Sequence, residues 1–390
     1  MQADAPSPPP PRSTRPGAVQ VARIYGVPIY LTTSWILLAL ILILGYGPLL
    51  SNERSGAVGY ILGLSIVVSL LLTVLLHELG HAAAARRYRV AVRGITLELL
   101  GGFTEMEGDA PTPRAEAAIA LSGPAVSFAL AAIGGGLLFV TDRGTVLGDL
   151  VFQVAATNAL VAVFNVLPGL PLDGGRALRA GIWGATRDPY RADMVAGWSG
   201  RVIAIVTLVT GLLLYRSFRL LSIVGLFFIA LVAITLWRGA TQSIQMAELK
   251  RRLPYVQAGA MARPLHLVVT GTPLAEALRQ RDERQQGAAD WTAPMILGVS
   301  DSSGRVIGLV SPKAVAAVPP GRRPWIGVDE VATPVAPAQR IAASLVGADV
   351  LAAVQANPGA DLLVTVGEDV VGVLRVEDVI TMLKSREPTT

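Results

Sequence analysis

Cysteine is absent from this 390-residue chain, and charged residues are scarce. Without a thiol, disulfide scaffolds, cysteine-ligated zinc, iron–sulfur clusters and cysteine nucleophiles are all excluded. Asp, Glu, Lys and Arg make up 16% of the residues, against roughly 25% in an average soluble protein. The mean hydropathy is +0.53. This composition excludes disorder for most of the chain and disfavours a soluble single-domain enzyme.

Histidine is almost as scarce, because the chain has only three. Any chemistry that needs imidazole must therefore use His77, His81 or His266. The formal net charge is +5. An excess of basic residues can indicate nucleic-acid binding, but basic residues at the ends of apolar spans also orient membrane proteins. We favour the second interpretation and expect no nucleic-acid partner.

Long uncharged stretches dominate the first 240 residues. A membrane-spanning helix needs about 20 apolar residues. Six segments are candidates: Leu31–Leu50, Ser55–Leu76, Ala117–Thr141, Leu150–Leu172, Met194–Tyr215 and Leu220–Trp237. The sequence therefore predicts a polytopic α-helical membrane protein with six transmembrane helices in the lipid bilayer.

Basic residues are distributed unevenly around these spans. A cytosolic N-terminus and six alternating spans place the Arg-rich segments 86–93, 176–191 and 238–252 in the cytosol. The opposite orientation reverses this bias. By the positive-inside rule, we expect a multi-pass protein of the cell membrane with both termini in the cytosol.

The composition changes at both ends of this membrane region. Residues 1–20 are predicted to be a flexible Pro-rich tail without the apolar region of a signal peptide. Beyond Trp237 no uncharged run is long enough to span a bilayer. We expect a membrane domain over 21–240, a linker helix over 241–256 and a soluble α/β domain over 257–385. Within that domain, 295–315 and 362–383 both follow a strand–turn–strand–helix pattern, which indicates a weak internal repeat.

The segment from His77 to His81 reads His-Glu-Leu-Gly-His at the end of the second span. Residues four apart share one face of a helix, so the two imidazoles can bind one Zn²⁺. The adjacent Glu78 can then serve as the general base for the water that the metal activates. Ionisable groups inside a membrane are costly and usually functional, which favours a metal site over two merely packed histidines.

A catalytic zinc usually has three protein ligands. His266 lies in the soluble region, so we interpret it as a surface or packed histidine. Asp173, at the end of the fourth span, is the better candidate because it shares the cytosolic membrane face with the histidine motif. Its alternative role is a helix-stop turn, which Pro168, Pro171 and the following glycines would also fit. These proline and glycine residues also break the helix, which lets the backbone and a substrate approach each other.

The pair of motifs resembles the site-2 protease family of intramembrane zinc metalloproteases. HELGH and the later N-x-x-P-x-x-P-L-D-G-G carry the resemblance, which covers about residues 20–240. It implies His77, His81 and Asp173 as zinc ligands and Glu78 as catalytic base. Asn165 matches the family's asparagine that helps to hold substrate.

Two further segments match the same family. Leu100-Gly101-Gly102 lies where members carry a small membrane-dipping β-hairpin, so Gly101 and Gly102 are expected to border the substrate. Ser122-Gly123-Pro124 matches a Gly-Pro element of the third span. Ser127 stands where many members have Asn, and no role is assigned to it. We also hypothesise that a strand edge near Leu97–Phe103 holds unwound substrate by β-augmentation.

The C-terminal region resembles a tandem pair of cystathionine-β-synthase-type (CBS) regulatory motifs. In that motif a hydroxyl residue contacts a nucleotide phosphate and an Asp three residues later holds the ribose. The first copy has Ser311 but Ala314 at the acidic position, and the second has Asp378 but Arg375 at the hydroxyl position. The resemblance implies an adenosine-nucleotide site at Ser311, Asp378 and Arg375, although neither copy is complete. The alternative is a packing and homodimerisation module.

These features predict a metalloendopeptidase that cuts a transmembrane protein within or near its membrane segment. The resemblance implies membrane-bound regulators as substrates, such as an anti-sigma factor or a transcription factor precursor, with gating by the CBS-like pair. One alternative is a transporter or channel with a CBS module, which would spread ionisable residues along a pathway. A second alternative is an HExxH membrane protease that trims prenylated proteins, in which a Glu is the third zinc ligand. A third is an inactive protease-like scaffold.

Overall fold

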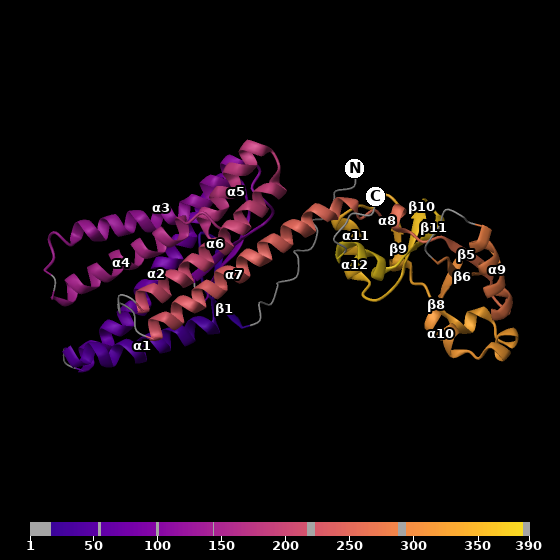
Figure 1. Ribbon diagram of the computed structural model, residues 1–390, viewed down its shortest axis with the longest axis horizontal. Helices are drawn as coiled ribbons and strands as arrows, with labels where there is room; N and C mark the ends of the chain where they lie inside the picture. Colours follow the sequence, from indigo (N-terminus) through magenta and orange to yellow (C-terminus); the bar gives the residue numbers. More distant parts are fainter. Residues whose placement is uncertain are drawn as a thin grey trace. The chain divides into compact units, whose positions relative to one another are not determined.

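The computed structural model describes two compact units (Figure 1). The described residues are 17–53, 56–98, 101–142, 144–216, 223–287 and 294–384. The units are Met1–Ala247 and Glu248–Thr390. The expected Pro-rich tail, up to residue 16, and Leu100 lie outside the described residues.

The N-terminal unit contains a four-stranded sheet. Its first two strands lie at the start of the described chain, and the predicted hairpin supplies the other two. The strands are β1 (Ala18–Ile24), β2 (Val27–Thr32), β3 (Val92–Glu98) and β4 (Gly101–Met106), in the order β1-β2-β3-β4. The β3–β4 hairpin is antiparallel, and β2 pairs with β3 in parallel. The hairpin was predicted, whereas β1 and β2 were not, and Leu31 belongs to β2 instead of a helix.

The sheet packs on the helices through one apolar face. Ile29 of β2 and Ile95 of β3 are fully buried, together with Trp35 and Leu38 of the first helix. Burial of such side chains contributes roughly 1.5–3 kcal/mol each. This packing fixes the hairpin against the helix that carries the histidine motif.

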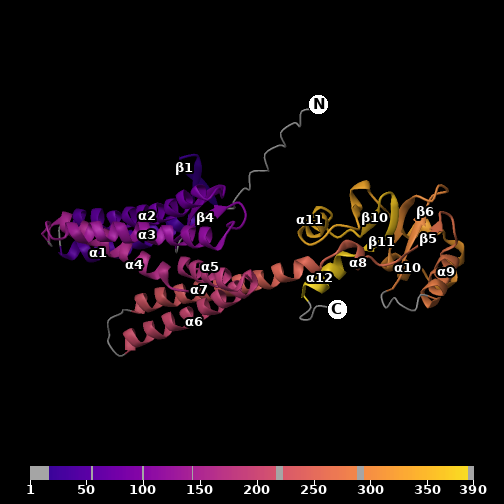
Figure 2. The ribbon, with the colours of Figure 1, turned by 90° about the horizontal axis from the view of Figure 1, so that it is seen from above.

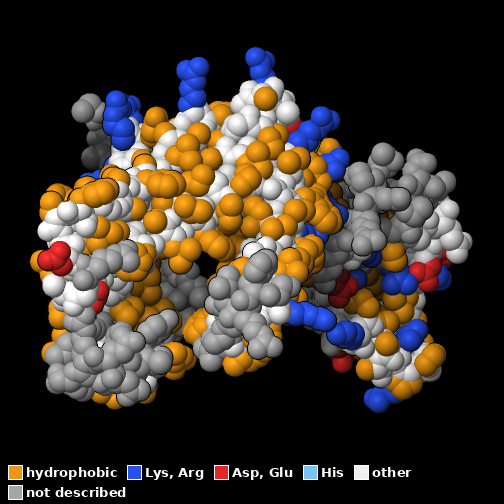
Figure 3. Space-filling view, turned by 60° about the vertical axis from the view of Figure 1, so that its left-hand side comes forward, with side chains coloured by type: hydrophobic (Ala, Val, Ile, Leu, Met, Phe, Trp, Pro, Cys, Tyr) orange, Lys and Arg blue, Asp and Glu red, His pale blue; other side chains and the backbone are white. Residues whose placement is uncertain are grey.

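Apolar helices form most of the N-terminal unit (Figure 2). They are α1 (Thr33–Glu53), α2 (Gly56–Arg87), α3 (Pro113–Leu137), α4 (Val146–Val166), α6 (Pro189–Arg216) and α7 (Ile223–Arg252). Among the described residues, five of them are long and apolar enough to cross a membrane, namely all but α1. The described apolar stretch of α1, Thr33–Leu44, is shorter. Figure 3 shows hydrophobic side chains covering much of the visible helical surface, as expected for contact with lipid.

Small residues bring α6 and α7 close together. A Cβ on Gly197 would lie 2.6 Å from Ile244 Cγ1, and one on Gly211 would lie 2.6 Å from Ile229 Cγ2. Helix pairs in membranes commonly pack through such small residues. The linker helix predicted over 241–256 does not begin as a separate helix. Its first residues continue α7, which runs without interruption to Arg252.

The fourth span ends earlier than the sequence predicted. Helix α4 stops at Val166, and residues 167–172 form an irregular loop with a cis Leu170–Pro171 bond. Asp173 is the first residue of the next helix, α5 (Asp173–Thr186), and does not end the span itself. A Cβ on Gly174 would collide with the Val166 carbonyl oxygen, so only glycine permits this close turn.

The C-terminal unit consists of two modules that share a three-stranded pattern, and the sheet of the first module has one additional strand. Two sheets run in the orders β5-β6-β7-β8 and β11-β10-β9. The strands are β5 (Leu265–Val269), β6 (Ile296–Ser300), β7 (Val306–Val310), β8 (Ala332–Pro334), β9 (Arg340–Ala342), β10 (Leu362–Val366) and β11 (Asp369–Leu374). The helices are α8 (Ala258–Met261), α9 (Leu274–Gly287), α10 (Pro312–Ala317), α11 (Ala348–Ala356) and α12 (Val376–Lys384).

The internal repeat is clearer in the structure than in the sequence. In each module a parallel strand pair is followed by an antiparallel one, β5–β6–β7 in the first and β9–β10–β11 in the second. A helix then follows each copy. Val306 and Leu309 pack with Leu363 and Val373, which joins the modules in one core. The unit thus has the α/β architecture expected of a CBS-type pair.

Candidate metal centre and active site

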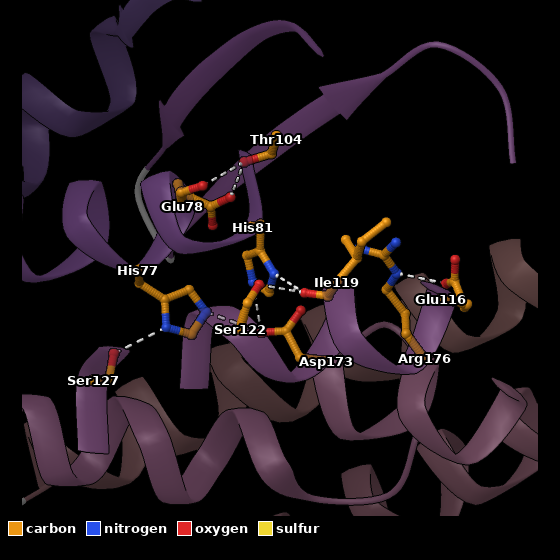
Figure 4. A network of polar contacts seen from close by, with 10 residues as sticks. All are labelled: His77, Glu78, His81, Thr104, Glu116, Ile119, Ser122, Ser127, Asp173 and Arg176. Atoms are coloured by element: carbon orange, nitrogen blue, oxygen red, sulfur yellow. Dashed lines mark hydrogen bonds and ion pairs between the residues drawn. The ribbon is translucent and has the colours of Figure 1, made fainter. Parts of the chain in front are cut away.

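Two imidazoles and one carboxylate meet at a single point (Figure 4). His77 and His81 lie one turn apart on α2, and Asp173 begins α5. Asp173 Oδ2 is 2.9 Å from His77 Nε2 and 3.1 Å from His81 Nε2. Both histidines are buried. The sequence predicted this group of three residues, and the fold brings them together across 96 positions of the chain.

The far side of each imidazole ring is also held. His81 Nδ1 lies 2.7 Å from the carbonyl oxygen of Ile119, to which it donates a hydrogen bond. The neutral ring therefore carries its proton on Nδ1 and leaves the Nε2 lone pair free. His77 Nδ1 is 3.0 Å from the hydroxyl of Ser127, which is fully buried on α3. Such partners orient imidazoles that bind metals through the other nitrogen.

Gly123 of α3 leaves the space beside both Nε2 atoms open. A Cβ at this position would lie 2.7 Å from His77 Nε2 and would be closer still to His81 Nε2. Any other residue would therefore fill the place where the nitrogens point. The sequence identified Gly123 by resemblance alone, whereas the structure gives the physical reason for a glycine.

The donor set fits a zinc ion. One ligand atom from each of His77, His81 and Asp173 lies within 4.8 Å of the others. Two imidazole nitrogens and one carboxylate oxygen match the three protein ligands of catalytic zinc, which leaves a fourth position for water. The Gly123 opening supplies room for the ion beside these three ligand atoms.

Glu78 lies beside this cluster, between α2 and the hairpin. Its side chain is buried, and the Thr104 hydroxyl on β4 is 2.7 Å from Oε2. The same hydroxyl is 3.1 Å from the Glu78 backbone carbonyl oxygen. Thr104 thus fixes the carboxylate to the strand. Sequence reasoning missed this residue, because a lone threonine in a strand has no distinctive signal.

The glycine pair of β4 lies on the same side of Glu78. A Cβ on Gly102 would lie 2.9 Å from Glu78 Cγ and 3.1 Å from Val74 Cγ1, so the strand backbone rests directly on α2. Gly101 has open space around it but a φ of 148°, which L residues rarely adopt. Among the described strands, β4 is an edge of its sheet, since it pairs only with β3.

An ion-pair network holds α5 behind the cluster. Arg176 Nε is 3.1 Å from Oε1 of Glu116, a buried carboxylate at the start of α3. Arg179 of α5 lies 3.9 Å from the same oxygen and forms a short contact with Asp193 of α6. Sequence reasoning did not single out this network. The buried carboxylate is compensated by two arginines, which also fixes the helix that presents Asp173.

Two further candidates from the sequence are Asn165 and His266. Asn165 is on the last turn of α4, half-buried, and forms no hydrogen bond among the described residues. His266 lies on β5, in the C-terminal unit, as the sequence suggested.

The candidate nucleotide contacts are all engaged within the C-terminal unit. The Ser311 hydroxyl caps α10 and accepts from Ala314 N at 3.4 Å. Asp378 forms two 2.6 Å hydrogen bonds with Arg263. Arg375 faces two acidic side chains, Asp361 at 3.5 Å and Glu377 at 3.6 Å. Binding of an adenosine nucleotide here stays a prediction.

Fold and site together define a helical membrane protein with a buried HExxH-plus-aspartate centre. Residues 65–154 match the profile of peptidase family M50. The chain is 31% identical to Rip3 of Mycobacterium tuberculosis, over 94% of this chain and 93% of that protein. It is 30% identical to a zinc metalloprotease of Methanocaldococcus jannaschii, over 65% of this chain and 68% of that protein.

The solved site-2 protease from Methanocaldococcus jannaschii is also similar. It is 28% identical and covers 58% of this chain and 95% of that chain, with a TM-score of 0.44. The chain belongs to peptidase family M50, the site-2 proteases. It is a zinc-dependent metalloprotease of the membrane, in a family whose members generally cleave membrane-embedded substrates.

Proposed function

We propose that His77, His81 and Asp173 hold the zinc ion and that Glu78 is the catalytic base for hydrolysis of a peptide bond in a membrane segment. The observation that carries this assignment is the convergence of both imidazole Nε2 atoms on one Asp173 oxygen. When bound, Zn²⁺ supplies a more acidic water and polarises the scissile carbonyl.

The residues around the ion each have a distinct part. Glu78 accepts the proton of the attacking water and returns it to the leaving amine. Thr104 donates a 2.7 Å hydrogen bond to the Glu78 carboxylate and so holds it against β4. Ser127 and the Ile119 carbonyl hold the two imidazole rings in place. The buried positions of these groups exclude bulk water from the reaction.

The substrate is proposed to bind as an extended segment along β4. A transmembrane helix must unwind before cleavage, because its carbonyls are hydrogen-bonded and shielded. The outer edge of β4 offers backbone partners for the unwound segment. Gly101 and Gly102 keep this edge free of side chains next to Glu78. Asn165 supplies an amide with no partner among the described residues and is proposed to hold the substrate backbone.

Substitution of the ligands and of the base separates metal binding from catalysis. Glu78→Gln is expected to keep a full equivalent of zinc and to lose cleavage of a co-expressed membrane substrate. His81→Ala and Asp173→Ala are expected to lose both. Zinc is measured on purified full-length protein by elemental analysis. Full cleavage by Glu78→Gln refutes the assignment of the base, and a full zinc content in Asp173→Ala refutes that of the third ligand.

The biological setting is proposed from the family and the sequence. Membrane-bound regulators, such as anti-sigma factors or transcription factor precursors, are the proposed substrates. Both termini and the C-terminal unit are proposed to lie in the cytosol, on the strength of the arginine distribution. Comparing the membrane proteomes of cells that carry the wild type or Glu78→Gln identifies the substrate, which accumulates only in the variant.

The CBS-type pair is proposed to gate the protease through an adenosine nucleotide or through homodimerisation. Thermal shift of the full-length protein with ATP tests the first possibility, with Asp378→Asn as the variant expected to respond less. Light scattering of Glu78→Gln in detergent tests the second. The absence of a thermal shift in the wild type, together with a monomeric Glu78→Gln variant, contradicts both routes of gating.

A further inference from the structure

Two tryptophans enclose an arginine where α6 meets α7. The guanidinium carbon of Arg201 is 4.6 Å from the ring centroid of Trp198 on the same helix and 5.2 Å from that of Trp237 on α7. Arg201 Nη2 also donates to Thr241 Oγ1 at 3.2 Å. Cation–π contacts of this kind stabilise a guanidinium but do not neutralise its charge.

The charge of Arg201 has no partner of opposite sign in the described part of the chain. Among the described residues, no carboxylate lies within ion-pair distance of it, and its buried Nε has no hydrogen-bond partner. A guanidinium has five N–H donors, and one of them is engaged here. An unpaired cation at membrane depth is costly, so such residues normally have an anionic partner.

Trp198 and Trp237 lie on the outer surface of the helix pair, and partly exposed tryptophans in apolar helices are typical of the level where lipid headgroups begin. Trp198 is 53% exposed and Trp237 is 43% exposed, although both belong to apolar helices. Tryptophans are enriched at the boundary between hydrocarbon and headgroups. In α7 this level is also where the apolar run ends, since Arg238 follows directly after Trp237.

We propose that Arg201, between Trp198 and Trp237, binds the phosphate of an anionic membrane lipid. The phosphate is the anion present at this depth, and a planar guanidinium binds it with two parallel hydrogen bonds. The two indole rings restrict the guanidinium through their cation–π contacts, and their exposed parts contact the glycerol region of the lipid. The hydrogen bond to Thr241 holds Nη2 of the guanidinium in place and leaves Nη1 for the phosphate.

The lipid site borders the loop that leads to Asp173. The Ser199 hydroxyl donates to the Pro168 carbonyl, and the backbone of Gly200 packs on that of Leu170. On the other helix, a Cβ on Gly239 would lie 2.6 Å from Pro171 Cγ. A lipid that contacts both α6 and α7 at Arg201 therefore stabilises the two helices on which this loop packs.

Native mass spectrometry of the full-length protein tests the proposal. The protein is titrated with phosphatidylglycerol, with a galactosyl diacylglycerol of the same acyl chains, or with inorganic phosphate. Wild type is expected to retain one phosphatidylglycerol tightly and to discriminate against the uncharged galactolipid. Arg201→Gln is expected to bind the tight phosphatidylglycerol about tenfold more weakly, as for loss of a charge-assisted hydrogen bond. Arg238→Gln, the neighbouring exposed arginine, is the matched control and should bind as wild type.

Several results would overturn the proposal. They are equal retention by wild type and Arg201→Gln, equal retention of the two lipids by wild type, and displacement of the lipid by millimolar inorganic phosphate alone. Arg201→Lys keeps the charge but not the planar fork and is expected to show intermediate retention. The discrimination between lipids is measured on wild type, so it decides the question even if Arg201→Gln does not fold.

Discussion

Ser127 Oγ lies 3.0 Å from Nδ1 of His77, although the two residues are 50 positions apart and on different helices. The contact connects α3 to the metal-facing ring on α2 and fixes its orientation. Partners of this kind typically change metal affinity by 10- to 100-fold when removed.

Ser127→Ala is therefore expected to weaken zinc binding by about tenfold without loss of the fold. The measurement is competition with a chromophoric chelator on purified full-length protein. Thr235→Ala is the control, because Thr235 is also a hydroxyl residue in an apolar helix but donates only within its own helix, to Leu231. Unchanged affinity in Ser127→Ala would mean that the hydroxyl does not orient His77.

Gly123→Ala is expected to abolish zinc binding. The added methyl group would occupy the space beside both Nε2 atoms, and the backbone of α3 cannot withdraw without breaking its contact with α2. Gly135→Ala, in the same helix but with open space around it, is the matched control. Elemental analysis of the two variants provides the comparison, and a full zinc content in Gly123→Ala contradicts the proposed position of the ion.

Gly102→Ala is expected to lower proteolysis and to leave zinc bound. Its methyl group would press on Glu78 Cγ and Val74, and so displace the base and lift the strand from α2. The ligands themselves are not touched. Gly181→Ala on α5, where a methyl group meets nothing, serves as the control. Wild-type cleavage by Gly102→Ala would show that the hairpin tolerates displacement at this position.

Thr104→Val removes the hydroxyl that holds Glu78 while keeping the shape of the side chain. We expect cleavage to fall by about tenfold at constant zinc content, because a hydrogen bond to a charged group contributes roughly 1.5–3 kcal/mol. Thr104→Ser restores the hydroxyl and should recover most of the activity. If Thr104→Ser is as impaired as Thr104→Val, packing and not the hydrogen bond explains the loss.

The sequence predicted the centre of the site better than its surroundings. His77, Glu78 and His81 follow a local spacing rule, and Asp173 could be chosen because the chain has no third histidine nearby. Ser127 and Thr104 belong to no local pattern, and their roles arise only from how α3 and β4 pack on α2. Long-range packing of this kind leaves no signal in a single sequence.

The fold was predictable where turns mark the elements. The two strand–turn–strand segments predicted within 295–315 and 362–383 are β6–β7 and β10–β11, because in each a polar turn separates two apolar runs. Strand β2 was missed for the opposite reason. Its residues Val27–Thr32 are uncharged and lead directly into α1, so a criterion based on charge merges the two.

The position of Asp173 at the start of α5 has a mechanical consequence. An ion held by His77, His81 and Asp173 closes a chain loop of 96 residues and acts as a removable cross-link between α2 and α5. In the metal-free protein, α5 is retained by its packing on α3 and α6 and by the ion pairs of Arg176 and Arg179. Faster hydrogen exchange in Asp173–Thr186 after chelation would show this loosening directly. The same ion would then set both the chemistry of the centre and the rigidity of the helix that completes it.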